Sequence, residues 1–157
     1  MPLTLIREAQ PKDTSGITTL LKHVCKELQW NYTKDFLPED SISTHYQQHN
    51  GKLFVAIKGK KVIGTIGYFS KKKEAMLLRF YLYPKYRRQG IGKKLYRHLI
   101  KELHKNKIRR LSLATANENI PHLTSFLNYN HYHRTTKPKM TPKYEKAPLY
   151  YKTRLQA

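Results

Sequence analysis

Apolar residues recur along this chain with two spacings, one typical of strands and one typical of helices. Short runs rich in β-branched and aromatic residues predict strands. The two runs on either side of Gly59-Lys60 predict a hairpin, because a short loop suffices to join antiparallel strands. A further dense run is ended by Pro84. The strands predicted in this half of the chain cover residues 3–7, 52–58, 61–70 and 75–83.

Helices are predicted where apolar residues lie three or four positions apart and so share one face. Asp13 or Thr14 is expected to cap the first helix, which ends at residues 30–32. Its apolar face consists of Ile17, Leu20, Leu21, Val24 and Leu28. Shorter helices are expected at 38–48 and 118–128. The central helix buries Ile91, Leu95, Leu99 and Leu103.

The order of these elements predicts an α/β domain with a mixed sheet. The run at 109–115 follows the central helix, so it is expected to lie parallel to the strand at 75–83. Strands are also expected at 131–136 and 149–155, with a loop between them that carries three prolines and four lysines. We therefore expect a single domain over residues 1–157.

Composition narrows the class of protein. Hydrophobic residues make up 39% of the 157 residues, which excludes a disordered chain. No apolar stretch approaches the roughly 20 residues of a membrane helix, and the first residues do not resemble a signal peptide. Cys25 is the sole cysteine, so no internal disulfide forms. These features favour a cytoplasmic protein without membrane contact, in which Cys25 acts as a small buried hydrophobe.

Charge adds a candidate partner. The chain has 31 lysines and arginines against 10 acidic residues, a formal net charge of +21. Such a field concentrates polyanions, so a nucleotide cofactor, RNA or a ribonucleoprotein is a candidate partner. The basic residues are spread along the chain rather than collected in a tail. A solvated surface without a nucleic-acid partner is the competing interpretation.

The loop before the central helix carries the strongest chemical signal. Glycines let the main chain approach a phosphate closely, and the N–H groups at a helix N-terminus favour an anion. Arg88, Lys93 and Lys94 add positive charge at the same place, although lysines on an exposed helix face need no ligand. The loop motif consists of Arg87, Arg88, Gln89, Gly90, Ile91 and Gly92.

With the preceding strand, RFYLYPKYRRQGIG, this motif resembles the acetyl-coenzyme A loop of the GCN5-related N-acetyltransferase (GNAT) superfamily. The order of predicted elements matches that family over nearly the whole chain. The resemblance implies an acyl-CoA N-acyltransferase fold, with a mixed, mostly antiparallel sheet of about six to seven strands and helices on both faces. It also implies an acyltransferase that moves acetyl from acetyl-CoA to a primary amine.

By this resemblance, the strand at 75–83 splays from the strand at 109–115 and the pantetheine arm lies between them. Leu82 and Tyr83 would then offer main-chain groups to the arm, and main-chain N–H groups of the same strand would polarise the thioester carbonyl. The loop from Arg87 to Lys93 would bind the pyrophosphate. Asn119, in NIPHLTSFLNYNHY, matches an asparagine of the family near the cofactor arm.

One departure from the family concerns the general acid. Phe126 stands where the family often has a tyrosine that protonates the leaving thiolate. Phenylalanine lacks that proton, so another hydroxyl is needed, and Tyr129, Tyr81 and Tyr83 are candidates. We expect Tyr129 to be the acid, with simple packing as the competing role for its ring. Phe126 itself is expected to contact the cofactor.

The acceptor site is less defined. In the family the segment between the first two helices lines it, which makes Trp30 and Tyr32 candidates for stacking on the acceptor. The strand residues Met76 to Arg79 include no acid, which disfavours a strongly cationic acceptor, whereas Arg79 could grip a carboxylate or phosphate. His131 and His133 are expected on one side of a strand, without the further ligands of a metal site.

Two alternatives to a small-molecule or protein amine acetyltransferase stay open. The fold can serve as a non-catalytic acetyl-CoA-binding module, which Phe126 would tolerate. It can also act on RNA or a ribonucleoprotein, which the net charge favours. The last strand pair is a candidate homodimer interface by resemblance to the family.

Overall fold

The fold is seen in a computed structural model that describes residues 3–29, 42–115, 123–141 and 149–155. Its strands form a seven-stranded sheet in the order β1-β2-β3-β4-β5-β7-β6. All neighbouring strands are antiparallel except β4 and β5. The strands are β1 (Thr4–Glu8), β2 (Lys52–Lys58), β3 (Lys61–Lys71), β4 (Glu74–Leu82), β5 (Arg110–Thr115), β6 (His133–Thr135) and β7 (Leu149–Arg154).

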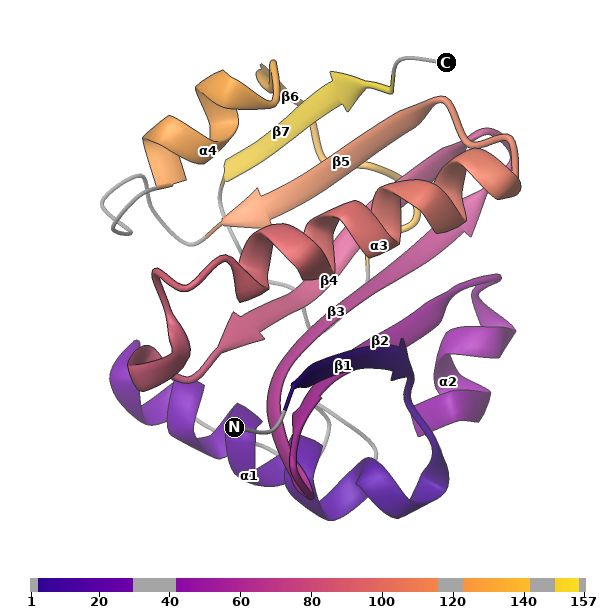
Figure 1. Cartoon of the computed structure of the whole chain (residues 1–157). Coiled ribbons are helices and arrows are strands. Elements are labelled where there is room, and N and C mark those ends of the chain that lie inside the picture. Colours follow the sequence, from indigo (N-terminus) through magenta and orange to yellow (C-terminus); the bar gives the residue numbers. More distant parts are fainter. Residues whose placement is uncertain (1–2, 30–41, 116–122, 142–148, 156–157) are drawn as a thin grey trace.

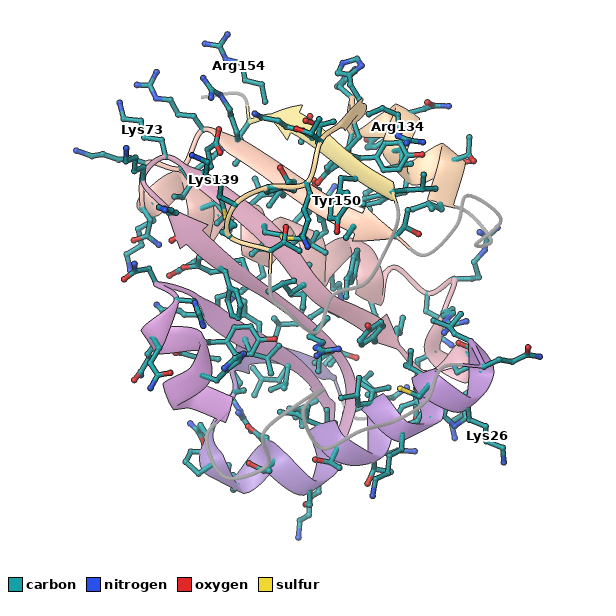
Figure 2. All side chains as sticks on the ribbon, turned by 180° about the vertical axis from the view of Figure 1, so that it is seen from behind. Lys26, Lys73, Arg134, Lys139, Tyr150 and Arg154 are labelled. Atoms are coloured by element: carbon teal, nitrogen blue, oxygen red, sulfur yellow. The ribbon has the colours of Figure 1, made fainter. Side chains whose placement is uncertain are left out.

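Helices cover both faces of this sheet (Figures 1 and 2). The helices α1 (Thr14–Glu27) and α2 (Ile42–Gln48) lie on one face, and α3 (Ile91–Lys105) and α4 (Leu123–Tyr129) lie on the other. Short 3-10 helices at Pro11–Asp13 and Pro84–Tyr86 precede α1 and α3. The mixed sheet predicted from the sequence, with helices on both faces, is confirmed.

The core forms where the predicted apolar faces meet the sheet. Ile91, Leu95, Leu99 and Leu103 of α3 are all buried, as the four-residue spacing predicts. The apolar face of α1 is buried too, except for Leu28, which follows the helix and is partly exposed. Gly64 of β3 lets α3 approach closely, because a Cβ there would lie 3.2 Å from the side chain of Leu95. Burial of these two faces holds the helices against the sheet.

Most predicted element bounds agree with the structure to within two residues. The predicted helices at 38–48 and 118–128 are seen as α2 and α4, and their first predicted turns lie outside the described residues. One prediction is wrong: His131 does not share a strand with His133, because it lies in the preceding turn with a φ of 58°. Among the described helices, none is long and apolar enough to span a membrane.

Candidate functional site

The site begins where β4 and β5 separate. Their parallel pairing runs from Glu74 opposite Arg110 to Leu77 opposite Leu113 and then stops, although β4 continues to Leu82. Along its other edge, β5 pairs with β7 over its whole length, from Arg110 to Thr115. Beyond Leu77, the edge of β4 that faces β5 therefore has no strand partner among the described residues. This opening can accept an extended chain, which would hydrogen-bond to β4 as an added strand does.

A bulge in β4 lies beside this opening. Thr65 of β3 faces Tyr81 and Gly67 faces Leu78, so two residues of β4, Arg79 and Phe80, lie opposite one residue of β3. Arg79 has a φ of 53°, a left-handed conformation that L residues rarely adopt. The Thr65 hydroxyl donates a hydrogen bond of 2.7 Å to the Arg79 carbonyl and so fixes the bulge. Main-chain groups at the bulge are released from the regular β3–β4 ladder.

The bulge directs its two side chains to opposite faces of the sheet. Arg79 is only 7% exposed and lies with Ile17, Leu20 and Leu21 of α1. Phe80 lies on the other face, where its ring is 6.3 Å from the ring of Tyr96 on α3. The opening between β4 and β5 therefore has a buried cation on the α1 side and an aromatic wall on the α3 side.

The glycine loop meets α3 at Gly90, the N-cap residue, with a φ of 82°. Only glycine adopts this conformation without strain. In the described part of the chain, no side chain caps α3, so the first N–H groups of the helix point toward the loop without an intrahelical acceptor. Gly92 is not required by packing, because a Cβ there would contact the Phe80 ring at 3.8 Å, an ordinary distance.

Cations surround this helix terminus. Arg88, Lys93 and Lys94 are all exposed beside it, and the dipole of α3 adds to their field. The amide of Gln89 donates a hydrogen bond to the Lys85 carbonyl over 3.1 Å, so its side chain shapes the loop. The buried Ile91 anchors the first turn of α3 to the core. This arrangement fits a pyrophosphate, the group that the loop motif predicts.

Arg87 plays a different part from its neighbours. Its Nε donates to the Leu82 carbonyl over 3.0 Å, and its two terminal nitrogens donate to the Glu27 carboxylate over 3.2 and 2.7 Å. The side chain thus ties the loop to the end of β4 and to the end of α1. These bonds position the loop, and direct contact of Arg87 with the cofactor stays a prediction.

Leu82 and Tyr83 differ in what their main chains can offer. The Tyr83 N–H donates to the Ile63 carbonyl over 3.1 Å, and the Tyr83 carbonyl accepts from the Tyr86 N–H over 3.0 Å. The main-chain N–H and carbonyl of Tyr83 therefore both have partners within the chain, and the predicted contact with the cofactor arm stays a prediction. The Leu82 carbonyl is turned toward the loop, as its bond from Arg87 shows. Of the two residues, Leu82 is the one whose main chain can face a ligand.

Phe126 of α4 lies in a cluster of four aromatic rings on the α3 side of the opening. Its ring centroid is 6.0 Å from that of Phe80, 5.0 Å from that of Tyr96 and 5.8 Å from that of Tyr132. The hydroxyls of Tyr96 and Tyr132 lie 3.0 Å apart and share a hydrogen bond. This pair could not be predicted, because nothing in the sequence links positions 96 and 132.

The environment of the pair distinguishes the two hydroxyls. Burial raises the pKa of Tyr132 well above its ordinary value, and the neighbouring Tyr96 raises it further. Burial also raises the pKa of Tyr96, but a hydrogen bond from Tyr132 lowers it. With Tyr132 as donor, the proton of Tyr96 can be directed to another acceptor. Tyr96 is then the better acid of the two.

The remaining candidates are placed less favourably or lie outside the described residues. The side chain of Tyr129 is 75% exposed and lines a groove that Tyr96 also lines, but its ring is not one of the four in the aromatic cluster. Trp30, Tyr32 and Asn119 lie outside the described residues. Arg79 lies on the α1 face of the sheet, and its contact with the acceptor stays a prediction.

Comparison of the sequence with known protein families finds one match. Residues 21–123 match the profile of the acetyltransferase (GNAT) family. No curated protein matches the chain at a significant level.

Solved structures share the fold. An acetyltransferase of the GNAT family from Staphylococcus aureus superposes with a TM-score of 0.86 at 21% identity, covering 98% of this chain and 100% of that one. The PaiA N-acetyltransferase from Thermoplasma acidophilum, in complex with coenzyme A, gives 0.73 at 18% identity over 98% and 99%. The ribosomal-protein-S18-alanine N-acetyltransferase from Escherichia coli gives 0.73 at 17% identity over 99% and 96%.

Proposed function

We propose, because the chain belongs to the acetyltransferase (GNAT) family, that it transfers an acetyl group to a primary amine by direct attack of the amine. The chain is an acyltransferase, and acetyl-CoA is its acetyl donor. The observation that supports this proposal most directly is the opening between β4 and β5 beside the uncapped N-terminus of α3. It offers strand-like hydrogen bonding and an anion site to one extended ligand.

The two parts of the opening suit the two parts of acetyl-CoA. The N–H groups of the first turn of α3, with Arg88 and Lys93, would hold the pyrophosphate. The Leu82 N–H would hold the pantetheine arm, and Phe80 and Phe126 would pack along it. When bound, the cofactor supplies an activated thioester. Main-chain N–H groups at the Arg79–Phe80 bulge are suited to donate to its carbonyl oxygen, where negative charge develops.

Proton delivery to the departing sulfur is assigned to Tyr96 rather than Tyr129. Tyr96 lies against Phe126, the position of the family's usual acid, and Tyr132 orients its hydroxyl. Tyr129 is exposed and outside that cluster. A general acid typically contributes about 100- to 10,000-fold to the rate. Proton donation by Tyr96 would therefore replace much of the rate that the missing tyrosine hydroxyl at position 126 would otherwise supply.

Direct attack is favoured over a covalent intermediate. Cys25, the chain's sole cysteine, lies on the same face as Arg79 but is only 2% exposed. Burial raises the pKa of its thiol, which therefore stays protonated and weakly nucleophilic. The incoming amine is then the nucleophile, and it must be neutral when it attacks.

Arg79 makes the acceptor side electropositive. A buried cation repels a second cation, so an acceptor with several ammonium groups is disfavoured. The same field lowers the pKa of a bound amine and increases its neutral fraction. An acceptor that carries a carboxylate or phosphate beside its primary amine fits this side best. We therefore propose an amino acid, a peptide or another anionic amine as the substrate class.

The test is acceptor-dependent release of coenzyme A, measured with a thiol reagent on a panel of amines. Amines that bear a carboxylate or phosphate are expected to react faster than polyamines. R79Q is expected to lower kcat/KM for the anionic amines at least about 10-fold, roughly the value of a charged hydrogen bond, and to raise it for polyamines, because the repulsion is removed. A panel in which polyamines react best would contradict the proposed substrate class.

A second function is favoured by Phe126, which removes the family's usual acid. On this alternative the chain binds acetyl-CoA without turnover. Isothermal titration that shows coenzyme A binding, together with no acceptor-dependent thiol over the whole panel, would support it and contradict the transferase. Failure to bind coenzyme A would contradict both functions.

A further inference from the structure

A basic groove lies at the end of the sheet away from the glycine loop. Its volume is about 890 Å³, and we call it the distal groove. The turn between β3 and β4 contributes Lys71, Lys72 and Lys73, and the segment after β6 contributes Lys137 and Lys139. Figure 2 shows Lys73, Lys139 and Arg154 gathered there, whereas Lys26 projects from the opposite end of the molecule.

The distal groove has little negative charge to balance these cations. Arg109 and Arg110 at the start of β5 add to it, as do Lys152 and Arg154 of β7. Among the described residues that line it, Glu74 is the only acid, and it already pairs with Arg110 at 2.9 Å and Lys152 at 3.4 Å. The groove therefore keeps a strong positive field that internal ion pairs do not cancel.

A second groove meets the first at a shared rim. It has a volume of about 1090 Å³ and lies between α3 and residues 129–133 and 153–155, and we call it the helix groove. Lys73, Arg109 and Arg154 line both grooves and form the rim between them. The helix groove also contains Tyr129, 75% exposed, and the imidazoles of His104 and His133.

The cations of the two grooves lie too far from the glycine loop to serve the proposed cofactor. The glycine loop lies at the N-terminus of α3, and the rim follows its C-terminus; a 15-residue helix is about 22 Å long. The rim cations are therefore too far from the loop to bind the same pyrophosphate. A polymer with repeated phosphates matches cations spread over two grooves, and flat rings beside them match unpaired bases.

We propose that the distal groove, the rim and the helix groove together bind single-stranded nucleic acid. Phosphates lie along the lysines of the distal groove and cross the rim, and a base stacks on Tyr129 in the helix groove. A duplex fits less well, because its bases are stacked inside and cannot reach a tyrosine ring.

The first experiment measures binding of a fluorescein-labelled uridine 20-mer by polarisation over a range of salt concentrations. We expect the affinity to fall with salt at a slope of about −3 or steeper, since each phosphate contact adds about −0.7 for a single strand. A slope shallower than about −1 would overturn the proposal, as would displacement of the oligomer by saturating coenzyme A.

Matched charge variants locate the site. K73E/K139E/R154E is expected to lose about 30-fold or more in affinity, because three contacts become repulsive. K26E/K60E/K101E changes the net charge equally but lies elsewhere, and it is expected to lose no more than about 3-fold. Equal losses in both variants would overturn the proposal. Coenzyme A binding reports whether each variant is folded. If the triple variant does not fold, R154Q alone is tested, and it is expected to make the slope of affinity against salt about 0.7 shallower.

A probe without bases separates nucleic acid from other polyanions. Y129A is expected to weaken binding of the uridine oligomer about 5- to 100-fold, the range for loss of one stacked base, and to leave binding of inorganic polyphosphate unchanged. Polyglutamate is expected to bind at least about 10-fold more weakly than the oligomer, because it offers no bases to stack. Equal binding of polyglutamate, or no effect of Y129A on the oligomer, would overturn the proposal.

Discussion

Because Phe126 stands where the family often has a tyrosine, another residue must supply the proton, and Tyr96 and Tyr132 lie beside it. Phe126 supplies an aromatic surface but no proton, and the nearest paired hydroxyls in the aromatic cluster belong to these two tyrosines. Tyr132 is almost fully buried, so it is suited to orient Tyr96 rather than to meet a ligand itself. On the proposed function, Tyr96 on α3 is the acid and Tyr132, which follows α4, supports it.

Removal of the Tyr96 hydroxyl tests this assignment. Y96F is expected to lower kcat about 10- to 100-fold, because the leaving thiolate loses its proton donor, while KM for acetyl-CoA changes little. Y132F is expected to shift the basic limb of the pH–rate profile upward, since its hydrogen bond lowers the pKa of Tyr96. Y129F is the control and should match the unmodified enzyme; loss of activity in Y129F alone would return the acid role to Tyr129.

Asp13 is a residue of structural rather than catalytic importance. Its carboxylate is 6% exposed and accepts hydrogen bonds from Arg7 at 2.7 and 2.9 Å and from the Gln10 N–H at 2.7 Å. The bonds from Arg7 lower the pKa of Asp13 below its ordinary value. This group therefore stabilises the fold above its unfolded-state pKa, and the stabilisation is lost as the pH falls through the folded-state pKa.

D13N tests the stabilisation that the lowered pKa of Asp13 implies. At pH 7 it is expected to reduce the free energy of unfolding by about 1–3 kcal/mol, the usual value for a hydrogen-bonded buried charge. The difference should narrow as the pH falls below about 4, where the native carboxylate is protonated as well. Urea titrations between pH 3 and 7 measure it, with the exposed Glu8→Gln as control. A difference that stays constant over this range would contradict the assignment.

At the scale of elements, the glycine loop depends on a helix that is distant in sequence. Arg87 joins the loop to Glu27 at the end of α1, and the two side chains are 43% and 30% exposed. Exposed ion pairs contribute only about 0–1 kcal/mol to stability. The pair is therefore expected to matter for the position of the loop more than for the stability of the fold.

E27Q tests this positioning role. KM for acetyl-CoA is expected to rise about 3- to 10-fold with kcat nearly constant, because a looser loop weakens binding of the donor in ground and transition state alike. The melting temperature should change little. Glu74→Gln, which breaks another exposed pair far from the loop, is the control and should leave this KM unchanged. An equal effect of both substitutions would argue against a specific role of the pair.

Several elements follow from local pattern alone, and others do not. The β2–β3 hairpin and the buried face of α3 were predictable, because turn residues and apolar spacing act within a few positions. The bulge at Arg79 was not, because it depends on how β3 and β4 pair at Thr65 and Gly67. The end of the β4–β5 ladder after Leu77 and Leu113 likewise depends on how whole strands diverge, and no local pattern marks it.

At the scale of the whole molecule, the net charge of +21 works against folding through self-repulsion. Added salt screens this repulsion, since the Debye length is about 10 Å at 0.1 M. The melting temperature is therefore expected to rise by several degrees between 10 and 200 mM sodium chloride, whereas binding of coenzyme A weakens over the same range. K26E/K60E/K101E should start higher and rise less. A melting temperature that falls with salt would show that attractive ion pairs outweigh the repulsion.

The sequence by itself determined the order of elements, the buried faces of the helices and the glycine loop that precedes α3, because these depend on residues close together in the chain. Only the tertiary structure decided which hydroxyl stands beside Phe126, since Tyr96 and Tyr132 are 36 positions apart. It also decided that Arg87 pairs with Glu27, 60 positions away, and so ties the loop to α1. Such pairs are set by the packing of whole elements, and local spacing carries no information about that packing.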